Sequence, residues 1–367
     1  MDFDHIQFYV DDAQRCRDWF TQVLGFQPLG STTTESDQIE LVHSGQIVCV
    51  LCSPLATQGS KSAVTCYLQH HPPGVCDLAF RVKDVKKALQ QAEQRGATIL
   101  QPLIIEQQDK GELRWGKVKG WGTLTHTLVE RCGQTTFLPI SLISATPPLL
   151  YQTHAPEGTS VTPLGFTQID HAVLNVSENQ LQTAVNWYQT VFGFQTQRYF
   201  DIQTHRSGLR SKVLVHPQGR VKFPINEPTS VNSQIQEFLD HNHGSGIQHI
   251  ALETVNIVDT ITQLRARGLS LLDIPPSYYS PLREKFESRF PHLDWLAIEQ
   301  QNILVDIEGG AESGILLQTF TQPIFKQPTF FWEIIERRQQ AQGFGQRNFL
   351  ALFEAIEREQ QKRGVFL

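Results

Sequence analysis

The chain has 367 residues, of which 40% are hydrophobic and 19% charged, and its formal net charge is −6. This length exceeds one average domain and favours two, and the composition is typical of globular proteins and not of disordered ones. A negative chain without a block of Lys or Arg argues against nucleic acid as the main partner, so we expect small-molecule substrates.

The first residues, MDFDHIQFYVDD, contain no basic segment followed by an apolar core, and no stretch approaches the roughly 18 unbroken apolar residues of a membrane span. We therefore expect a cytoplasmic protein without a membrane segment. All six cysteines lie within the first 132 residues. Cys49 and Cys52 form a CxxC inside the strand-like run QIVCVLC, which predicts reduced core thiols because no second ligand pair completes a zinc site.

An internal repeat organises the chain. The segment FDHIQFYVDDAQRCRDWFTQVLGFQ from Phe3 reads like IDHAVLNVSENQLQTAVNWYQTVFGFQ from Ile169, and a second pair of similar segments begins at Cys76 and Ile247. Each segment predicts a strand and then an amphipathic helix, and the helices of the second pair end at Gly96 and Gly268. A unit of one strand, one helix and further strands thus occurs four times.

A linker separates the two halves. Residues 138–165 are rich in Pro, Ser, Thr and Gly, which is typical of a connection that runs over the surface. We place the boundary near residue 150, with an N-terminal domain over residues 1–150 and a C-terminal domain over residues 151–367.

Three residues of the C-terminal half are candidate metal ligands. In an alternating strand, Ile169, His171 and Val173 point one way, while Asp170 and Ala172 point the other way. The same alternation places His249 and Glu333 on core-facing rows of their strands.

Two imidazoles and one carboxylate form the facial triad of non-haem Fe(II) oxygenases, which leaves coordination positions open for substrate and dioxygen. The alternative for any one of these histidines is a hydrogen-bonded core residue. The combination favours a metal, because a buried Glu333 is unfavourable without a cation or partner. In the N-terminal half, His5 remains, but Asp77 and Thr127 occupy the other two equivalent positions. We predict that the first half has lost the metal site.

The repeated units resemble the vicinal oxygen chelate superfamily, whose paired βαβββ modules form half-open barrels around a metal. Within it, the phrases GLRSKVL, FPINEP, SQIQEFL, GIQHIAL, PPSYY, GILLQTFTQP, PTFFWEIIER and GFGQRNFLALFEAIE resemble the 4-hydroxyphenylpyruvate dioxygenase family. The resemblance covers essentially the whole chain. It implies an α+β fold of two such domains, with one Fe(II) held by His171, His249 and Glu333.

The resemblance also implies a substrate pocket. Alternation places Leu316, Gln318 and Phe320 on one strand face, and a buried amide such as Gln318 needs a partner, which the protein backbone could also supply. By resemblance, the catalytic residues beyond the triad are Gln318, Asn226 and Gln248. The substrate-binding set implied by the family comprises Ser211, Asn226, Gln234, Gln248, Gln318, Phe320, Phe331, Phe344, Asn348, Phe349 and Phe353.

Residues 343–364 predict a glycine-hinged turn and an amphipathic helix. Phe349, Leu352, Phe353 and Ile356 follow the i, i+3, i+4, i+7 spacing, which alone indicates ordinary helix packing. By resemblance this helix is a lid that brings Phe349 over the pocket, opposite Phe331.

The activity that the resemblance implies is oxidative decarboxylation of 4-hydroxyphenylpyruvate with O2, ring hydroxylation and side-chain migration to homogentisate. Such a product serves tyrosine catabolism or tocopherol biosynthesis. One alternative is 4-hydroxymandelate synthase, although Asn226 and Phe331 favour ring attack by the family pattern. Another is a non-catalytic ligand-binding protein of the same fold. Family habit also implies a homodimer.

Overall fold

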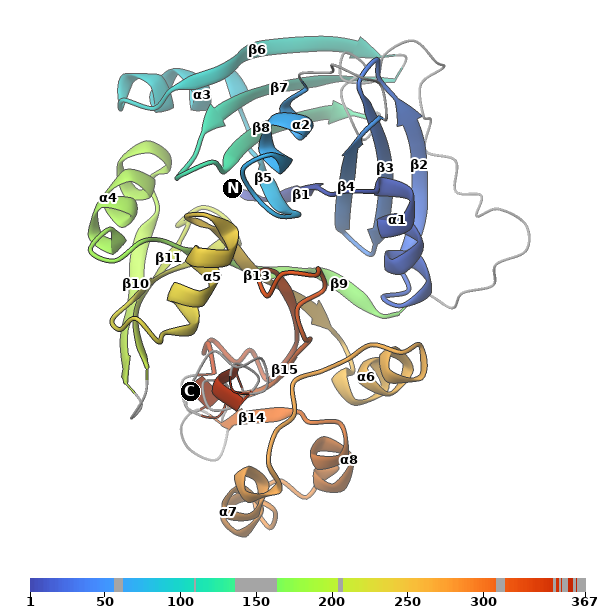
Figure 1. Cartoon of the computed structure of the whole chain (residues 1–367), viewed down its shortest axis with the longest axis vertical. Coiled ribbons are helices and arrows are strands. Elements are labelled where there is room, and N and C mark those ends of the chain that lie inside the picture. Colours follow the sequence, from blue (N-terminus) through green and yellow to red (C-terminus); the bar gives the residue numbers. More distant parts are fainter. Residues whose placement is uncertain are drawn as a thin grey trace.

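A computed structural model describes residues 1–55, 62–108, 110–135, 164–203, 207–307, 314–345, 348–349, 351, 356–358 and 361. The described chain forms two eight-stranded sheets, one from each half of the sequence (Figure 1). The predicted linker and the boundary near residue 150 fall almost entirely outside the described residues. The division at that residue therefore stays a prediction.

The first half contains the elements β1 (Asp2–Tyr9), α1 (Ala13–Gln22), β2 (Gln27–Thr33), β3 (Asp37–Ser44), β4 (Ile47–Pro54), α2 (Ala63–Leu68), β5 (Gly74–Arg81), α3 (Val85–Gln94), β6 (Ile99–Gln108), β7 (Gly111–Lys119) and β8 (Thr125–Gly133). The second half contains β9 (Phe166–Asn175), α4 (Leu181–Phe192), β10 (Gln195–Gln203), β11 (Gly208–Val215), β12 (Lys222–Pro228), α5 (Gln234–Asn242), β13 (Gly246–Thr254), α6 (Ile257–Ala266), α7 (Pro276–Phe286), α8 (Trp295–Gln300), β14 (Leu304–Ile307), β15 (Ile315–Phe320) and β16 (Phe331–Arg338).

The two sheets have the same topology. Their strand orders are β2-β3-β4-β1-β5-β8-β7-β6 and β10-β11-β12-β9-β13-β16-β15-β14. In each sheet the first strands of the two modules pair antiparallel at the centre, as β1 with β5 and β9 with β13. Each first strand also pairs in parallel with the last strand of its own module, as β13 does with β16. The predicted α+β class with four βαβββ modules is confirmed.

Similar hydrogen bonds recur at the helix N-termini of the repeated modules. Asp12, Asp84 and Asn256 are N-caps whose side chains accept a backbone N–H of the first turn. In three modules a buried glutamate on the last strand also accepts from the first residue of the helix, as Glu336 does from the Ile257 N–H at 2.8 Å. Because a helix N-terminus favours negative charge, each such glutamate fixes the helix against its own sheet.

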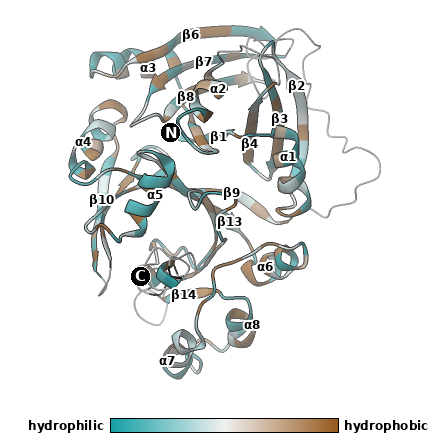
Figure 2. Cartoon of the chain, viewed as in Figure 1, coloured by the Kyte–Doolittle hydropathy of each residue, from teal (hydrophilic) through white to brown (hydrophobic). Residues whose placement is uncertain are grey.

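One hydrophobic core joins the two halves. Phe8 on β1 packs against Trp332 on β16, with ring centroids 6.0 Å apart, and both side chains are fully buried. His126 on β8 bonds the Tyr188 hydroxyl of α4 at 3.0 Å. Figure 2 shows α5 mostly hydrophilic with a few hydrophobic residues, as expected of a helix that buries only one face, which includes Ile235, Phe238 and Leu239.

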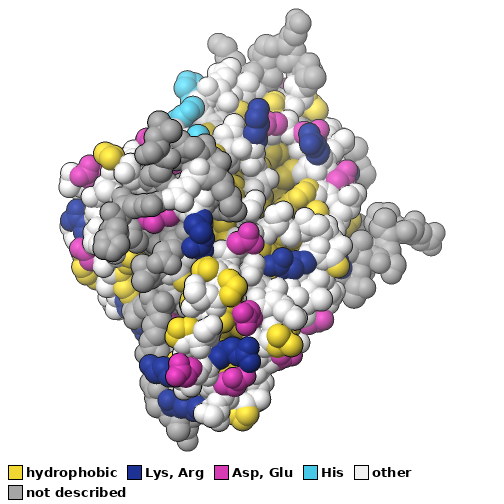
Figure 3. All heavy atoms as spheres, turned by 60° about the horizontal axis from the view of Figure 1, so that its bottom comes forward, with side chains coloured by type: hydrophobic (Ala, Val, Ile, Leu, Met, Phe, Trp, Pro, Cys, Tyr) yellow, Lys and Arg dark blue, Asp and Glu magenta, His cyan; other side chains and the backbone are white. Residues whose placement is uncertain are grey.

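The visible surface carries mixed charge. On the face that includes α7 and α8, Lys and Arg side chains are interspersed with Asp and Glu (Figure 3). No helix in the described part of the chain is long and apolar enough to cross a membrane. Cys49 and Cys52 are buried and free, which confirms that they are core thiols.

Candidate metal centre

The three predicted ligands meet on adjacent strands at the centre of the second sheet. His171 lies on β9, His249 on β13 and Glu333 on β16, and each is no more than 9% exposed. Glu333 Oε2 lies 3.1 Å from His171 Nε2 and 3.6 Å from His249 Nε2. One ligand atom from each residue lies within 4.8 Å of the others, and no other such group of three occurs among the described residues.

The Nδ1 atoms of both imidazoles bond elsewhere, which directs each Nε2 inward. His171 Nδ1 lies 2.8 Å from Asp170 Oδ1, and His249 Nδ1 lies 3.2 Å from Gln248 Oε1. Such partners orient metal-ligating histidines and fix their tautomer. The donor set of two imidazoles and one carboxylate fits a divalent iron with open coordination positions.

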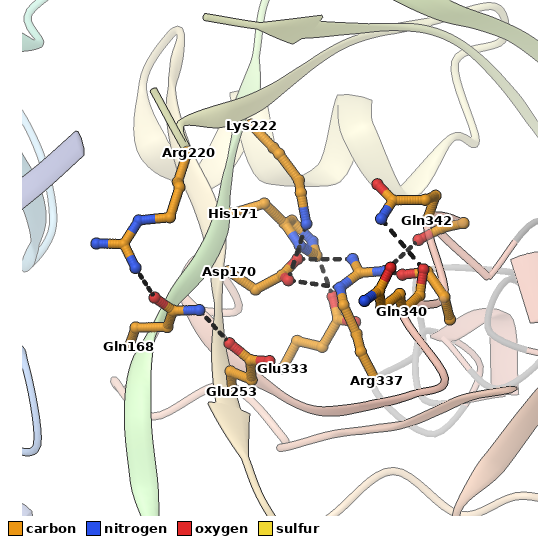
Figure 4. A network of polar contacts seen from close by, with 12 residues as sticks. Gln168, Asp170, His171, Arg220, Lys222, Glu253, Glu333, Arg337, Gln340 and Gln342 are labelled. Atoms are coloured by element: carbon orange, nitrogen blue, oxygen red, sulfur yellow. Dashed lines mark hydrogen bonds and ion pairs between the residues drawn. The ribbon is translucent and has the colours of Figure 1, made fainter. Parts of the chain in front are cut away.

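Asp170 does not follow the alternation expected from the sequence. Its carboxylate bonds the His171 ring and the Arg337 guanidinium, and it also contacts the Lys222 ammonium, instead of pointing away from the ligand (Figure 4). The reason is a shift in the pairing of β9 with β13, where one extra residue lies between Ile169 and His171. Bulges of this kind re-aim a side chain beside a functional site.

The electrostatics of the triad depend on burial and mutual charge. Burial alone would lower the pKa of His171, but the charge of Glu333 and the hydrogen bond to Asp170 outweigh it and raise that pKa. Burial lowers the pKa of His249 well below its ordinary value, and the neighbouring His171 lowers it further. The charge of Glu333 thus favours the protonated form of His171 in the metal-free protein, and a bound metal would displace that proton.

A cavity of about 650 Å³, counted to its open mouth, lies over the triad. It is lined by twelve of the residues predicted from the sequence: His171, Ser211, Asn226, Gln234, Gln248, His249, Gln318, Phe320, Phe331, Glu333, Phe344 and Phe349. Two predicted residues are not among the lining. Asn348 is fully buried and accepts a hydrogen bond from the Tyr278 hydroxyl at 2.6 Å, whereas Phe353 lies outside the described residues.

The lining also contains apolar residues that were not among the predicted site residues: Val173, Phe200, Ile202, Leu209, Val213, Pro224, Ile235 and Ile356. Strand alternation could have found most of them. Val173 is two residues beyond His171, and Leu209 and Val213 flank Ser211 on one face of β11. Pro224 stands likewise two residues before Asn226.

Two aromatic rings pack directly on the candidate ligands His171 and His249. The Phe331 ring stacks on His249 with centroids 4.8 Å apart, and the Phe344 ring meets His171 edge-on at 5.7 Å. The amide oxygens of Gln234 and Gln318 are buried and have no hydrogen-bond partner in the described part of the protein. Since buried polar atoms are normally paired, a ligand in this cavity is their natural partner.

The first half keeps the scaffold of this site without its ligand set. His5 bonds Asp4 at 2.9 Å, and Arg131 holds Asp4 at 2.7 Å, as Arg337 holds Asp170. Asp77 takes the place of His249 and pairs with the Lys117 ammonium at 3.4 Å. Thr127, opposite Glu333 in the repeat, bonds Asp77 at 3.0 Å. In this half an ammonium group balances the buried carboxylate.

The comparisons with known proteins agree with this architecture. Residues 168–292 match the model of the Glyoxalase/Bleomycin resistance protein/Dioxygenase superfamily, and residues 1–143 match the model described as Hydroxyphenylpyruvate dioxygenase, HPPD, N-terminal. A triple mutant of 4-hydroxymandelate synthase from Streptomyces coelicolor is similar in structure, with a TM-score of 0.80, 26% sequence identity and 98% of each chain covered. Fold and site define a vicinal oxygen chelate protein with one candidate metal centre among the described residues.

Two curated relatives specify the family. The 4-hydroxyphenylpyruvate dioxygenase of Caenorhabditis briggsae is 38% identical over 376 residues, covering 99% of this chain and 92% of the relative. That of Dictyostelium discoideum is 36% identical and covers 99% of both chains. The chain belongs to the 4-hydroxyphenylpyruvate dioxygenase family.

Proposed function

We propose that the protein is an Fe(II)-dependent enzyme that converts 4-hydroxyphenylpyruvate and O2 to homogentisate and CO2. The observation that carries the proposal is the buried group of His171, His249 and Glu333 at the base of the cavity, in a chain similar to these dioxygenases over nearly its whole length. An iron held there would supply electrons and the open coordination positions that a 2-oxo acid and dioxygen require.

The other residues of the cavity would bind and orient the substrate. The unpartnered oxygens of Gln234 and Gln318 can each accept a hydrogen bond, and the phenolic hydroxyl of the substrate offers one. Asn226 donates to Asn175 at 3.3 Å, which fixes the amide that it presents to the cavity. Gln248 orients His249 and completes the catalytic set.

Aromatic side chains would hold the ring and exclude water. Phe331 is fixed by its stack on His249, and Phe320 lies beside both, with centroids 6.2 Å from Phe331. From the C-terminal segment, Phe344 and Phe349 reach the same cavity. We infer that residues 343–364 form a lid, as the resemblance to the family implies; most of them lie outside the described residues. A closed, dry site protects a reactive oxidant from side reactions.

The second candidate is 4-hydroxymandelate synthase, because a solved structure of such a synthase shares this fold at a TM-score of 0.80. Oxygen uptake with iron, ascorbate and 4-hydroxyphenylpyruvate, followed by chromatography of the product, separates the candidates. Homogentisate supports the proposal, 4-hydroxymandelate supports the synthase, and the absence of uptake by iron-loaded protein supports a binding protein without activity.

The metal assignment has a control inside the chain. His171→Ala should abolish turnover and stoichiometric iron binding, whereas His5→Ala, which alters the equivalent histidine of the first half, should retain both. If His5→Ala lost iron and His171→Ala kept it, the assigned half would be wrong. The homodimer and the cytoplasmic location remain predictions from the sequence.

A further inference from the structure

Arg337 lies where the support of one metal ligand meets the start of the C-terminal segment (Figure 4). Its Nε and Nη2 donate to the two carboxylate oxygens of Asp170 at 2.6 and 2.8 Å, and Asp170 in turn bonds His171. Its Nη1 donates to the main-chain carbonyls of Ala341 and Gly343 at 3.0 and 2.7 Å. One guanidinium therefore joins the ligand support on β9 to the turn after β16.

The chain that leaves this turn comes directly over the triad. Phe344 follows Gly343, and its ring meets His171 edge-on, while the Arg337 guanidinium lies 5.9 Å from the centroid of the same ring. Gly345 then packs closely on the Gln318 amide. The direction of the His171 ring and the course of residues 341–345 are thus set by the same side chain.

These bonds require an arginine. The Arg337 side chain is only 9% exposed and uses its planar fork to hold a carboxylate and two carbonyls at once. A lysine offers one compact ammonium, which could balance Asp170 but could not span both partners. Lys222 already contributes such a charge at 3.0 Å from Asp170. Beyond its charge, Arg337 orients the Asp170 carboxylate and connects it to the turn after β16.

We propose that Arg337 is a positioning residue that couples the metal ligand His171, through Asp170, to the turn that starts the C-terminal segment. Metal bound at His171 then holds the turn in place, and disorder of the turn frees Asp170 and weakens the metal. The coupling is reciprocal, as linkage between two binding events requires. This inference rests on the proposed metal function.

The first half offers a matched control. Arg131 holds Asp4 as Arg337 holds Asp170, Asp4 bonds His5 as Asp170 bonds His171, and the Arg131 side chain is 15% exposed. His5 does not belong to a metal-binding group in the described part of the chain. Arg131→Met therefore removes an equivalent buried ion pair without touching the metal support.

The test uses full-length protein stripped of metal and Fe²⁺ alone, under argon, in competition with a chromophoric chelator. Arg337→Met should lower the Fe²⁺ affinity about 10-fold, the lower end of what loss of a ligand's own hydrogen-bond partner causes, because Arg337 acts on His171 through Asp170. Amide hydrogen exchange at Phe344 and Gly345 should slow on Fe²⁺ binding in the wild type and no longer respond in the variant. Arg337→Lys should restore affinity in part but not this response, and Arg131→Met should keep both.

Each outcome decides one point. If the wild-type chain binds no Fe²⁺, the metal assignment is wrong, and the proposed function is wrong with it. If the wild type binds Fe²⁺ and Arg337→Met binds it equally well, the positioning role is overturned. A lowered affinity with an unchanged exchange response removes the coupling to the turn. An equal loss in Arg131→Met would reveal general destabilisation and overturn the inference, and Arg337→Lys provides the comparison should the methionine variant fold poorly.

Discussion

Replacing Gly345 with alanine is expected to lower kcat/KM about 10- to 100-fold while the chain stays folded. The backbone of Gly345 has φ +69°, in the left-handed region, where a side chain costs about 1–2 kcal/mol. An added Cβ would also come within 2.6 Å of Gln318 Nε2 and closer still to Oε1, whereas ordinary contacts begin at 3.4 Å.

The site cannot absorb this contact by letting Gln318 turn into solvent, because that residue is 1% exposed. Its amide must retreat by about 1 Å within a packed interior, or the segment that carries Phe344 must lift from the cavity. A displacement of about 1 Å in a positioning group costs about 100-fold in rate. Either movement therefore disturbs substrate binding more than it disturbs stability.

Gly193→Ala is the matched control. Gly193 has φ +75°, but an added Cβ there meets nothing within 4 Å. Urea denaturation should give Gly193→Ala a loss of unfolding free energy of about 1–2 kcal/mol. Gly345→Ala should lose somewhat more, because the contact with Gln318 adds to the backbone cost. Oxygen-uptake kinetics should separate them, since only Gly345→Ala touches the cavity. Equal kcat/KM values in the two variants would refute the contact with Gln318 as the cause.

Three further outcomes are expected. Phe8→Ala should lower the unfolding free energy by about 3–5 kcal/mol in guanidinium titrations, because its fully buried ring packs on Trp332. A loss below about 1 kcal/mol would argue against a core shared by the two halves. Tyr278→Phe should speed amide exchange at Asn348, whose side chain loses a 2.6 Å hydrogen bond, and unchanged exchange would show that this bond does not hold the segment. Burial alone would raise the pKa of Asp4, but hydrogen bonding from a histidine and the charge of a nearby arginine outweigh it and hold that pKa well below its ordinary value. Asp4 therefore contributes its full stabilisation above pH 3.8 and begins to lose it below that pH, as the pH falls toward its lowered pKa. Between pH 7 and pH 3, Asp4→Asn should thus lose less unfolding free energy than the wild type in urea titrations. An identical loss in the two proteins would contradict the ion pair.

The repeat and the triad were predictable because both rest on local regularities. Strand alternation places His171 and Glu333 on core-facing rows, and the similarity of the two segments aligns His171 with His5. Asp170 was misplaced because a bulge depends on the register of the partner strand, which the sequence of β9 alone does not contain. Arg337, which bonds Asp170, is 167 positions away in the chain, and no local sequence pattern predicts such a contact.

Asn348 illustrates a second limit. The resemblance places it among the substrate-binding residues, whereas in the structure its Oδ1 accepts from the Tyr278 hydroxyl and it does not line the cavity. A role in substrate binding stays a prediction. Which side of a helix start faces the cavity depends on where the first turn begins, and sequence patterns locate such boundaries only within a few residues. Phe344 and Phe349, on the same segment, do line the cavity as expected.

The hydrophobic core that joins the two halves connects substitutions in the first half to the candidate metal centre in the second. Trp332 stands immediately before the candidate ligand Glu333 on β16 and packs on Phe8 and Phe20 of the first half. A substitution that shrinks either phenylalanine removes support directly behind a ligand-bearing strand, although it lies more than 300 positions from that ligand in the sequence. A substitution at Phe8 is therefore expected to act like substitutions around the candidate metal centre, although Phe8 lies in the other half of the chain.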